Sequence, residues 1–327
     1  MKLHLWGYLL GTILLWQGCA TTPPRNETAS ATDRLPALKV QGNQLMNVNG
    51  DTVVLHGVSY GWHNLWPRFY NGQSARHLIE DWGAQLLRAS MGIGINDLSY
   101  LVNPEYGVHC VTAVVDAAIE YGAYVLIDWH SHTIETEAAK RFFTEMATRY
   151  KGVPNVIYEI FNEPVDDSWE EVKAYAIEVI RAIRAVEPDA VILVGSPHWD
   201  QDIRQVADNP IEGFSNLMYT VHFYAGTPKQ WLRDEANYAM DKGIPLFISE
   251  CAAMNADGDG PLDREEWKRW TDWMDEHHLS WAAWSLSDKH ETCSMLLPSA
   301  SSEGGWSEWE IKEWGQMVKK ELKDTNH

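Results

Sequence analysis

The sequence predicts a single-domain α/β protein that folds as a (β/α)8 barrel, the TIM-barrel architecture. Strand-like apolar runs alternate with helix-like segments eight times along the 327-residue chain. The starts of successive runs lie 26 to 40 residues apart, which is enough for a helical crossover between parallel strands. One large barrel of this kind commonly takes about 250 residues as a single domain. An open doubly wound sheet is the alternative, but no G-x-G-x-x-G motif follows the first run.

The N-terminal segment is expected to lie outside the barrel. Residues 1–18 have a short basic start and then an apolar run that is too short for a lasting membrane span, so they predict a signal peptide. The segment continues into LWQGC (15–19), which resembles the lipobox of bacterial lipoproteins with Cys19 as the lipidated residue, although Trp16 departs from the usual aliphatic residue. Residues 19–37 are rich in Thr, Pro, Ser and Ala, as a solvated tether would be. We therefore expect an exported protein that a lipid on Cys19 anchors at the bacterial cell surface or outer membrane, with ordinary cleavage and secretion as the alternative.

The barrel domain is expected over residues 38–327, beginning with a hairpin and continuing with eight strands. The hairpin is KVQGNQLMNVNGDTVVL (39–55), with Asn49-Gly50 as its turn, and we expect it to close the bottom of the barrel. The strand-like runs are almost continuously apolar, which is typical of parallel strands buried on both faces. In chain order they are VVLHGVSY (53–60), AQLLRASM (84–91), YVLIDWH (124–130), VIYEIFNEP (156–164), VILVGSP (191–197), LMYTVHFY (217–224), PLFISEC (245–251) and SWAAWSLSD (280–288).

Helical patterns lie between these runs. Apolar residues in the segment 111–119 recur at the i, i+3, i+4, i+7 spacing of a helix face. Ser168 with Glu171 has the spacing of a capping box at a helix start, and an apolar stripe follows it. Asp263 with Glu266 offers a similar start before a segment that contains several tryptophans. Each pattern therefore supports a helix between two strands.

Composition excludes some classes of function. The apolar content of 45% is ample for a core, so wholesale disorder is excluded. The formal net charge of −20 would repel a phosphate backbone, so a nucleic-acid partner is not expected. The 17 tryptophans indicate either flat, uncharged ligands that stack on rings or a dense aromatic core.

The four cysteines are few for an exported protein of this size. If Cys19 carries a lipid, three remain (Cys110, Cys251 and Cys293), and an odd number leaves at least one free thiol. Cys251 and Cys293 both follow late strands, so either a neighbouring pair or two buried free thiols fits the sequence.

Polar residues collect where the predicted strands end. In a barrel these carboxyl ends face one mouth, and catalytic groups lie there. Glu163 and Glu250 end the fourth and seventh runs, which are otherwise mostly apolar, so the two carboxylates would face each other across the mouth. A buried carboxylate is costly unless it is paired or functional. Two facing carboxylates are the arrangement that cleaves a glycosidic bond.

Several short motifs lie at or near the ends of the predicted strands, namely Asn162-Glu163-Pro164 and Ser249-Glu250, together with Asp128-Trp129-His130, His222-Phe223-Tyr224 and WSLSDK (284–289). In these motifs the sequence resembles glycoside hydrolase family 5, in its bacterial endoglucanase branch. They agree in order and spacing, and the resemblance covers roughly residues 38–320. It implies a retaining endo-β-1,4-glucanase, a cellulase that hydrolyses internal β-1,4-glucosidic bonds by double displacement.

The resemblance also implies the catalytic roles. Glu163 would be the general acid/base and Glu250 the nucleophile, with their carboxyls roughly 5–5.5 Å apart. Arg88 would keep Glu250 ionised, and Tyr224 would donate a hydrogen bond to it. Asn162 would bond the 2-hydroxyl of the sugar.

Further positions would bind the sugar chain. By the same resemblance, His130 and His222 line the cleavage subsite, and Trp284 is a stacking floor for the sugar to be cleaved. Other expected sugar contacts, two of them in the loop GWHNLWPRFYN (61–71), are His63, Trp66, Trp199, Lys289 and Glu291. The expected partner is thus a neutral β-1,4-glucan polymer or oligosaccharide, and we expect the protein to be a monomer.

Other interpretations stay open. Cys251-Ala252 follows the predicted nucleophile where the family usually has Trp-Gly, which could shift substrate preference toward a mannan or a xyloglucan on the same barrel. Outside the enzymes, a glucan-binding surface protein would keep the aromatic cleft without turnover, although both carboxylates and Arg88 are present.

We expect no cofactor and no metal site. His130-Ser131-His132 resembles the metal pair of some barrel hydrolases, but that pair lies on the first strand, and the later ligands are not found in order. The segment 255–266 fits the spacing of a calcium-binding loop, but a polar turn that leads into the Asp263 helix start explains it as well.

Overall fold

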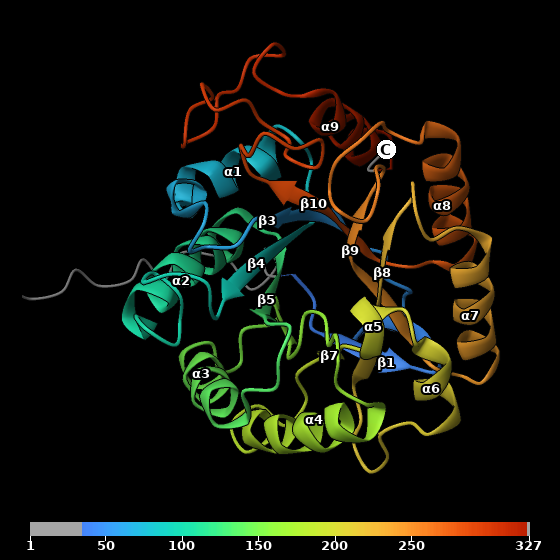
Figure 1. Ribbon diagram of the computed structural model, residues 1–327. Coiled ribbons are helices and arrows are strands. Elements are labelled where there is room, and N and C mark those ends of the chain that lie inside the picture. The colour runs from blue at the N-terminus through green and yellow to red at the C-terminus, as the bar shows by residue number, and fades with distance from the viewer. Residues whose placement is uncertain (1–34, 326–327) are drawn as a thin grey trace, which may run out of the picture. The chain divides into compact units, whose positions relative to one another are not determined.

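The structure of the protein is a computed structural model that describes residues 35–325 (Figure 1). Its eight barrel strands pair in the closed order β10-β3-β4-β5-β6-β7-β8-β9, and every neighbouring pair is parallel. The helices lie around the outside of these strands (Figure 1). The predicted (β/α)8 barrel is therefore confirmed. The predicted signal peptide, the tether up to residue 34 and Cys19 lie outside the described residues.

Each barrel strand falls in one of the eight predicted apolar runs or reaches one residue past its end. The strands are β3 (His56–Tyr60), β4 (Leu86–Gly92), β5 (Tyr124–His130), β6 (Val156–Glu159), β7 (Ile192–Val194), β8 (Leu217–Tyr224), β9 (Leu246–Ala252) and β10 (Trp281–Leu286). Every residue within the strands β3, β4, β5, β6, β7, β9 and β10 is buried. Strands covered on both faces therefore explain the apolar runs.

The helices follow the predicted patterns. They are η1 (Pro67–Phe69), α1 (Gly72–Glu80), α2 (Pro104–Tyr121), α3 (Thr136–Arg149), α4 (Trp169–Arg184), α5 (Pro197–Asp200), α6 (Ile203–Asp208), α7 (Gln230–Asp241), α8 (Arg264–His277) and α9 (Glu313–Thr325). The capping box predicted from Ser168 and Glu171 is present at the start of α4. Asp263 caps α8 by accepting the backbone N–H of Glu266. Within the described part of the chain, no helix is long and apolar enough to cross a membrane.

The N-terminal hairpin turns at a different place from the one predicted. β1 (Leu38–Gln41) pairs with β2 (Gln44–Asn47) in antiparallel register, so the turn is at residues 42–43. Gly42 has φ +62°, a conformation that glycine adopts readily. Asn49-Gly50 belongs to the next turn, after which Thr52 bridges back to Met46. The prediction of Asn49-Gly50 as the hairpin turn was wrong, because the sequence contains two glycine turn signals and only packing selects between them.

The hairpin does cover the bottom of the barrel. Leu38 and Leu45 are buried in one cluster with residues that point into the barrel, among them Leu86, Leu126 and Phe247. Pairing at the earlier turn brings Leu38 and Leu45 into this cluster together. The predicted position of the hairpin is therefore confirmed. The three described cysteines, Cys110, Cys251 and Cys293, are free and buried, which agrees with the second of the two alternatives above.

Candidate active site

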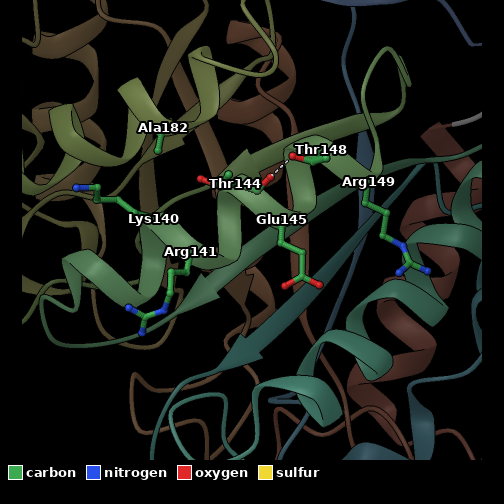
Figure 2. Close-up of a pocket in the computed structure, with 7 residues that line it drawn as sticks. All are labelled: Lys140, Arg141, Thr144, Glu145, Thr148, Arg149 and Ala182. Carbon is green, nitrogen blue, oxygen red and sulfur yellow. Dashed lines mark hydrogen bonds between the residues drawn. The ribbon is translucent and has the colours of Figure 1, made fainter.

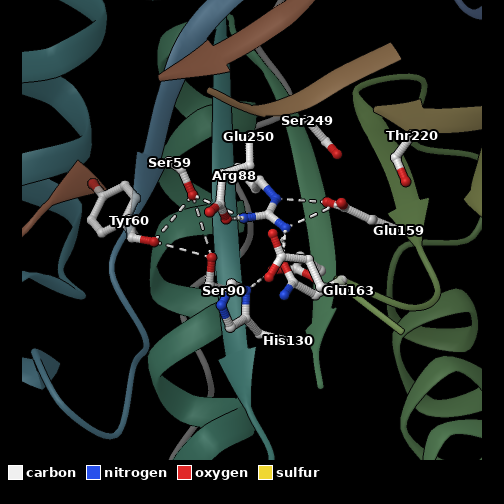
Figure 3. Close-up of polar contacts among 12 residues, drawn as sticks. Ser59, Tyr60, Arg88, Ser90, His130, Glu159, Glu163, Thr220, Ser249 and Glu250 are labelled. Carbon is white, nitrogen blue, oxygen red and sulfur yellow. Dashed lines mark hydrogen bonds and ion pairs between the residues drawn. The ribbon is translucent and has the colours of Figure 1, made fainter. Parts of the chain in front are cut away.

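The two predicted catalytic carboxylates lie together at the mouth of the barrel. Glu163 follows β6 and Glu250 lies in β9, and both are buried. One oxygen of each carboxylate lies within 4.8 Å of the other (Figure 3). Two carboxyl groups this close can act on the same bond, one as an acid and the other as a nucleophile.

Glu250 differs from Glu163 in its partners, a cation on one oxygen and a hydroxyl on the other. Arg88 donates from Nη1 to Glu250 Oε2 at 3.0 Å, and the Tyr224 hydroxyl donates to Oε1 at 2.6 Å. Burial, and then the charge of Glu163, raise the pKa of Glu250, while His222, Arg88 and the Tyr224 hydrogen bond oppose the rise. Donors on both oxygens also orient the carboxylate for attack. The predicted hydrogen bond from Tyr224 is present, and Arg88 contacts the same carboxylate. That Arg88 keeps Glu250 ionised stays a prediction.

Arg88 is the centre of a buried ionic network (Figure 3). Its side chain is fully buried, and it donates to Glu159 through Nε at 2.7 Å and Nη2 at 3.1 Å. Nη2 also lies 3.1 Å from Asp128 Oδ2 and donates to Asn162 Oδ1 at 2.6 Å. Asp128 and Glu159 are register partners on β5 and β6, so the sheet itself sets this arrangement. Glu159 was not predicted, although an acid inside the apolar run VIYE is a signal that could have found it.

Glu159 provides a test of this network through pH. Burial alone would raise the pKa of Glu159, but the charge of Arg88 and the hydrogen bonds from His222 and Arg88 lower it from 4.5 to about 2. Because the folded-state pKa is the lower one, the stabilisation is complete above about pH 4.5 and is lost as the pH falls toward 2. We expect Glu159→Gln to lower the free energy of unfolding by about 3 kcal/mol near neutral pH. Urea unfolding at several pH values should show this difference shrinking below pH 4.5.

The matched control for that experiment is Glu265→Gln, since the Glu265 side chain is 89% exposed. This variant should unfold like the wild type at every pH. A difference between wild type and Glu159→Gln that stays constant down to about pH 3 would contradict the lowered pKa of Glu159.

Glu163 is held by histidines. His222 Nδ1 lies 2.9 Å from Glu163 Oε1, and His132 Nδ1 lies 3.7 Å from Oε2. On its other side, His222 Nε2 lies 2.8 Å from the hydroxyl of Ser249. The predicted place of His222 beside the reacting bond agrees with this geometry. No role was predicted for Ser249 within the Ser249-Glu250 motif, and the structure shows its hydroxyl in contact with His222.

The ring of His130 stacks against that of Trp284, near the expected cleavage subsite. The two rings are stacked, with centroids 5.1 Å apart and planes 6° from parallel. His130 Nδ1 lies 2.6 Å from Asp128 Oδ2. Burial, and then the nearby charge of Arg88, lower the pKa of His130 well below its usual value, so the ring is neutral. Trp62, which was not predicted as a site residue, contacts His130 edge-on at 4.6 Å and is only partly buried.

The side-chain amide nitrogen of Asn162 is free to bind a ligand. Its oxygen accepts from Arg88, whereas its buried Nδ2 has no protein hydrogen-bond partner. A buried donor without a partner is unfavourable, so a ligand oxygen at this position would be stabilised. This contact fits the predicted bond to a sugar hydroxyl.

His63 is not placed to bind sugar. It is fully buried, its Nδ1 accepts the backbone N–H of Gly92 at 3.0 Å, and its Nε2 lies 3.1 Å from the carbonyl oxygen of Leu98. Burial lowers its pKa to about 4, which suits a neutral ring that joins two loops. The structure corrects the predicted role of His63, and Trp62 occupies the mouth position instead. Trp66 is half-buried and packs over Gly61.

The remaining predicted contacts lie on the rim. Trp199 follows β7 and is 47% exposed, so its ring is free to stack. Lys289 and Glu291 form an ion pair with each other after β10. Cys251 and Ala252, which replace the usual Trp-Gly, are fully buried in β9.

One group of three described side chains is close enough to hold a metal ion, namely Glu163, His222 and Glu250. Its ligand atoms already have partners, and Arg88 beside Glu250 would repel a cation. The residues of the rejected histidine pair have separate partners, since His130 contacts Asp128 and His132 contacts Glu163. The donor set therefore fits acid–base chemistry better than a metal ion.

A hollow of about 610 Å³ lies elsewhere, on the outer faces of α3 and α4 (Figure 2). It contains none of the motif residues. Its lining residues are Lys140, Arg141, Thr144, Glu145, Thr148, Arg149 and Ala182. It has no pair of facing carboxylates, so the mouth of the barrel remains the candidate site.

Comparison with known proteins identifies related sequences. The family model "Cellulase (glycosyl hydrolase family 5)" matches residues 46–290. An endoglucanase of Clostridium saccharobutylicum is 38% identical over 98% of this chain and 72% of its own length. Endoglucanase A of Evansella cellulosilytica and endoglucanase Z of Dickeya dadantii are 40% and 39% identical over 84% of this chain. The chain spans 57% and 65% of the length of those two relatives.

Solved structures are similar as well. A protein from Cytophaga hutchinsonii is 41% identical, with a TM-score of 0.87 over 89% of this chain and 95% of that one. The catalytic domain of a Thermobifida fusca endoglucanase, in complex with cellotetraose, is 33% identical, with a TM-score of 0.83 over 88% of this chain and 97% of that one.

Proposed function

The chain belongs to glycoside hydrolase family 5, and on that premise we propose that it is a retaining endo-β-1,4-glucanase. The observation that carries the proposal is the pair Glu163 and Glu250, whose nearest oxygens are within 4.8 Å of each other. Retaining glycosidases place their carboxyls about 5–5.5 Å apart, whereas inverting enzymes need about 6.5–9.5 Å to admit a water. The short separation supports direct attack by one carboxylate.

The reaction has two steps. In the first, Glu250 attacks the anomeric carbon and forms an ester bond to it, while the bond to the leaving oxygen breaks and Glu163 gives that oxygen its proton. In the second, Glu163 takes a proton from water, the water oxygen bonds to the anomeric carbon, and the ester to Glu250 breaks. Two inversions retain the anomeric configuration.

Neighbouring residues support these steps. Arg88 and Tyr224 orient Glu250 through contacts of 3.0 and 2.6 Å, and both oppose the rise in its pKa that burial causes. The free Nδ2 of Asn162 can donate to the 2-hydroxyl, a bond that strengthens in the transition state. Trp284 offers a ring face beside His130 for the sugar that is cleaved.

The proposed substrate is a neutral β-1,4-glucan. The names of the three relatives given above, and the cellotetraose held by the Thermobifida fusca enzyme, support this choice. The net charge of −20 does not oppose it, because a neutral chain binds through ring faces and hydroxyls. A mannan or xyloglucan substrate is the alternative, and the Cys251-Ala252 substitution is the feature that favours testing it.

Reducing-end release from four soluble polymers tests this proposal. The polymers are carboxymethyl-cellulose, mixed-linkage β-glucan, glucomannan and xyloglucan, each with a chelator present. We expect strong release from the first two. Preference for glucomannan or xyloglucan would keep the mechanism and change the substrate, and no release by the folded protein would favour a binding function.

We also propose that the protein is exported, anchored through Cys19 and active as a monomer. The lipobox-like sequence supports the anchor. The test is fractionation of cells that express either the wild type or Cys19→Ala. We expect the wild type in the membrane fraction and Cys19→Ala in the soluble fraction. A membrane fraction that is unchanged by the substitution would contradict the anchor, and light scattering of the barrel domain measures its oligomeric state.

A further inference from the structure

The turn after β7 has an unusual backbone. His198, Trp199 and Asp200 have φ values of +52°, +57° and +59°, so three consecutive residues other than glycine are left-handed. Each such residue costs about 1–2 kcal/mol relative to the right-handed conformation. Strain of this kind persists only where surrounding contacts hold it, and it is concentrated at functional sites.

The turn directs two neighbouring side chains in opposite directions. Trp199 is 47% exposed, whereas Asp200 is fully buried. The backbone N–H of Trp199 donates to the carbonyl of Pro164 at 3.0 Å, so the turn is bonded to the residue that follows the acid/base. The turn therefore lies beside the general acid/base.

Asp200 has partners on both of its oxygens. Oδ1 accepts the backbone N–H of Ser196 at 2.7 Å, which closes the turn. Oδ2 accepts the hydroxyl of Thr220 on β8 and lies 3.3 Å from His222 Nε2. One buried carboxylate therefore contacts both the strained turn and the histidine that holds the acid/base. A buried acid is retained only where such contacts compensate for its desolvation.

His222 is surrounded by acids. Glu163 and Glu159 face it from the β6 side at 2.9 and 3.7 Å, Asp200 faces it from α5, and Glu250 is its register partner on β9. Burial alone would lower the pKa of His222, but the charge of Asp200, and then the contacts with Glu159 and Glu163, raise it well above its usual value. Neither Glu163 nor Asp200 contacts Arg88 among the described interactions, so His222 is the basic side chain that Asp200 faces. Burial raises the pKa of Asp200, and the charge of His222 and the hydrogen bonds from Thr220 and Ser196 oppose the rise.

We propose that Asp200 is a positioning residue for proton donation: it holds His222 against the general acid/base Glu163 and, through Ser196, keeps the left-handed turn that presents Trp199. This inference rests on the proposed glycosidase function and adds a residue to it. The motifs that define the site do not include Asp200. Its effect on the reaction passes through Glu163, so it should matter only where the leaving group needs a proton.

Two substrates separate this role from a purely structural one. Cellopentaose has a poor leaving group that Glu163 must protonate, whereas 2,4-dinitrophenyl β-cellobioside releases a phenolate without protonation. In Asp200→Asn the amide keeps the shape of the side chain and can still accept from Ser196, but the charge is lost. We expect kcat/KM for cellopentaose to fall about 10- to 100-fold, and that for the aryl substrate to change less than about threefold. The pH profile for cellopentaose should also move.

The matched control is Asp202→Asn, on the same turn. Asp202 pairs with His198 at 2.6 Å and contacts neither His222 nor Glu163 among the described interactions, so both substrates and the pH profile should be unchanged. Asp200→Ala removes the acceptor for Ser196 as well, so it should add an increase in KM for cellopentaose. If the Asp200 variants do not fold, Thr220→Val removes one donor to Asp200 and should show the same substrate selectivity, at about three- to tenfold.

The outcomes are distinct. An equal loss on both substrates, with an unmoved pH profile, would overturn the role of Asp200 and leave the proposed function intact. A wild-type protein that is folded and inactive on both substrates would overturn the proposed function, and the inference would fall with it.

Discussion

Glu250→Gln is expected to lower kcat/KM on soluble β-glucan by at least about 10⁴-fold, which corresponds to about 5.5 kcal/mol of transition-state stabilisation. The amide cannot form the ester with the anomeric carbon, so double displacement stops at its first step. The fold should survive, because Arg88 keeps Glu159 and Asp128 as partners and the repulsion between Glu163 and residue 250 is removed. Initial rates on carboxymethyl-cellulose measure the loss.

Binding should remain in this variant. Trp284, His130 and Asn162 are unchanged, so the affinity for cellotetraose in calorimetry should stay within about threefold of the wild type. Glu265→Gln on the outer face of α8 is the matched control and should be fully active, since its side chain is 89% exposed. A Glu250→Gln variant that hydrolyses glucan at the wild-type rate would disprove the assignment of the nucleophile.

Glu163→Ala is expected to have a different signature from Glu250→Gln. General acid catalysis contributes about 10²–10⁴-fold, so kcat/KM on the polymer should fall by about 10³-fold. With 2,4-dinitrophenyl β-cellobioside the first step needs no acid, so kcat/KM should change less than about tenfold. The second step then lacks its base, and the glycosyl-enzyme should accumulate.

Azide distinguishes the acid/base from a residue that merely supports the fold. It attacks the glycosyl-enzyme without needing a base, and the missing Glu163 side chain leaves room for it. We expect azide to raise kcat of Glu163→Ala on the aryl substrate and to give a glycosyl azide of retained anomeric configuration. Equal losses on both substrates, with no effect of azide, would assign Glu163 a structural role.

The fold was largely predictable because its signals are local. Strands buried on both faces need continuous apolar runs, so YVLIDWH and LMYTVHFY marked β5 and β8 with the bounds that the structure has. The capping box of Ser168 and Glu171 is likewise a short-range pattern, and it lies at the start of α4. The prediction of the hairpin turn was wrong, because the sequence contains two glycine turn signals and neither is favoured by its local sequence. Burial of Leu38 and Leu45 selects the first.

The supporting residues of the site were harder to predict, because their value depends on partners far away in the sequence. Glu159 and Asp200 contact Arg88 and His222, which lie 71 and 22 positions away. The apolar run around Glu159 is a local signal that it is buried, but nothing local distinguishes Asp200 from an acid that faces solvent. The neighbours Trp62 and His63 show the same limit. The sequence does not tell which of two adjacent rings faces the mouth and which is buried, and the structure places Trp62 against His130 and buries His63.

The sequence by itself determined the barrel fold and the identity of both catalytic carboxylates. Apolar runs, helix caps and an acid at the end of a strand are all features of short segments of the chain. The tertiary structure alone decided how those carboxylates differ. The charge of Arg88 and the hydroxyl of Tyr224 act on Glu250, whereas His222, backed by Asp200, acts on Glu163. Electrostatic interactions act through space and are strong only at short distance in a buried site, so closure of the barrel is what gives two identical side chains two different roles.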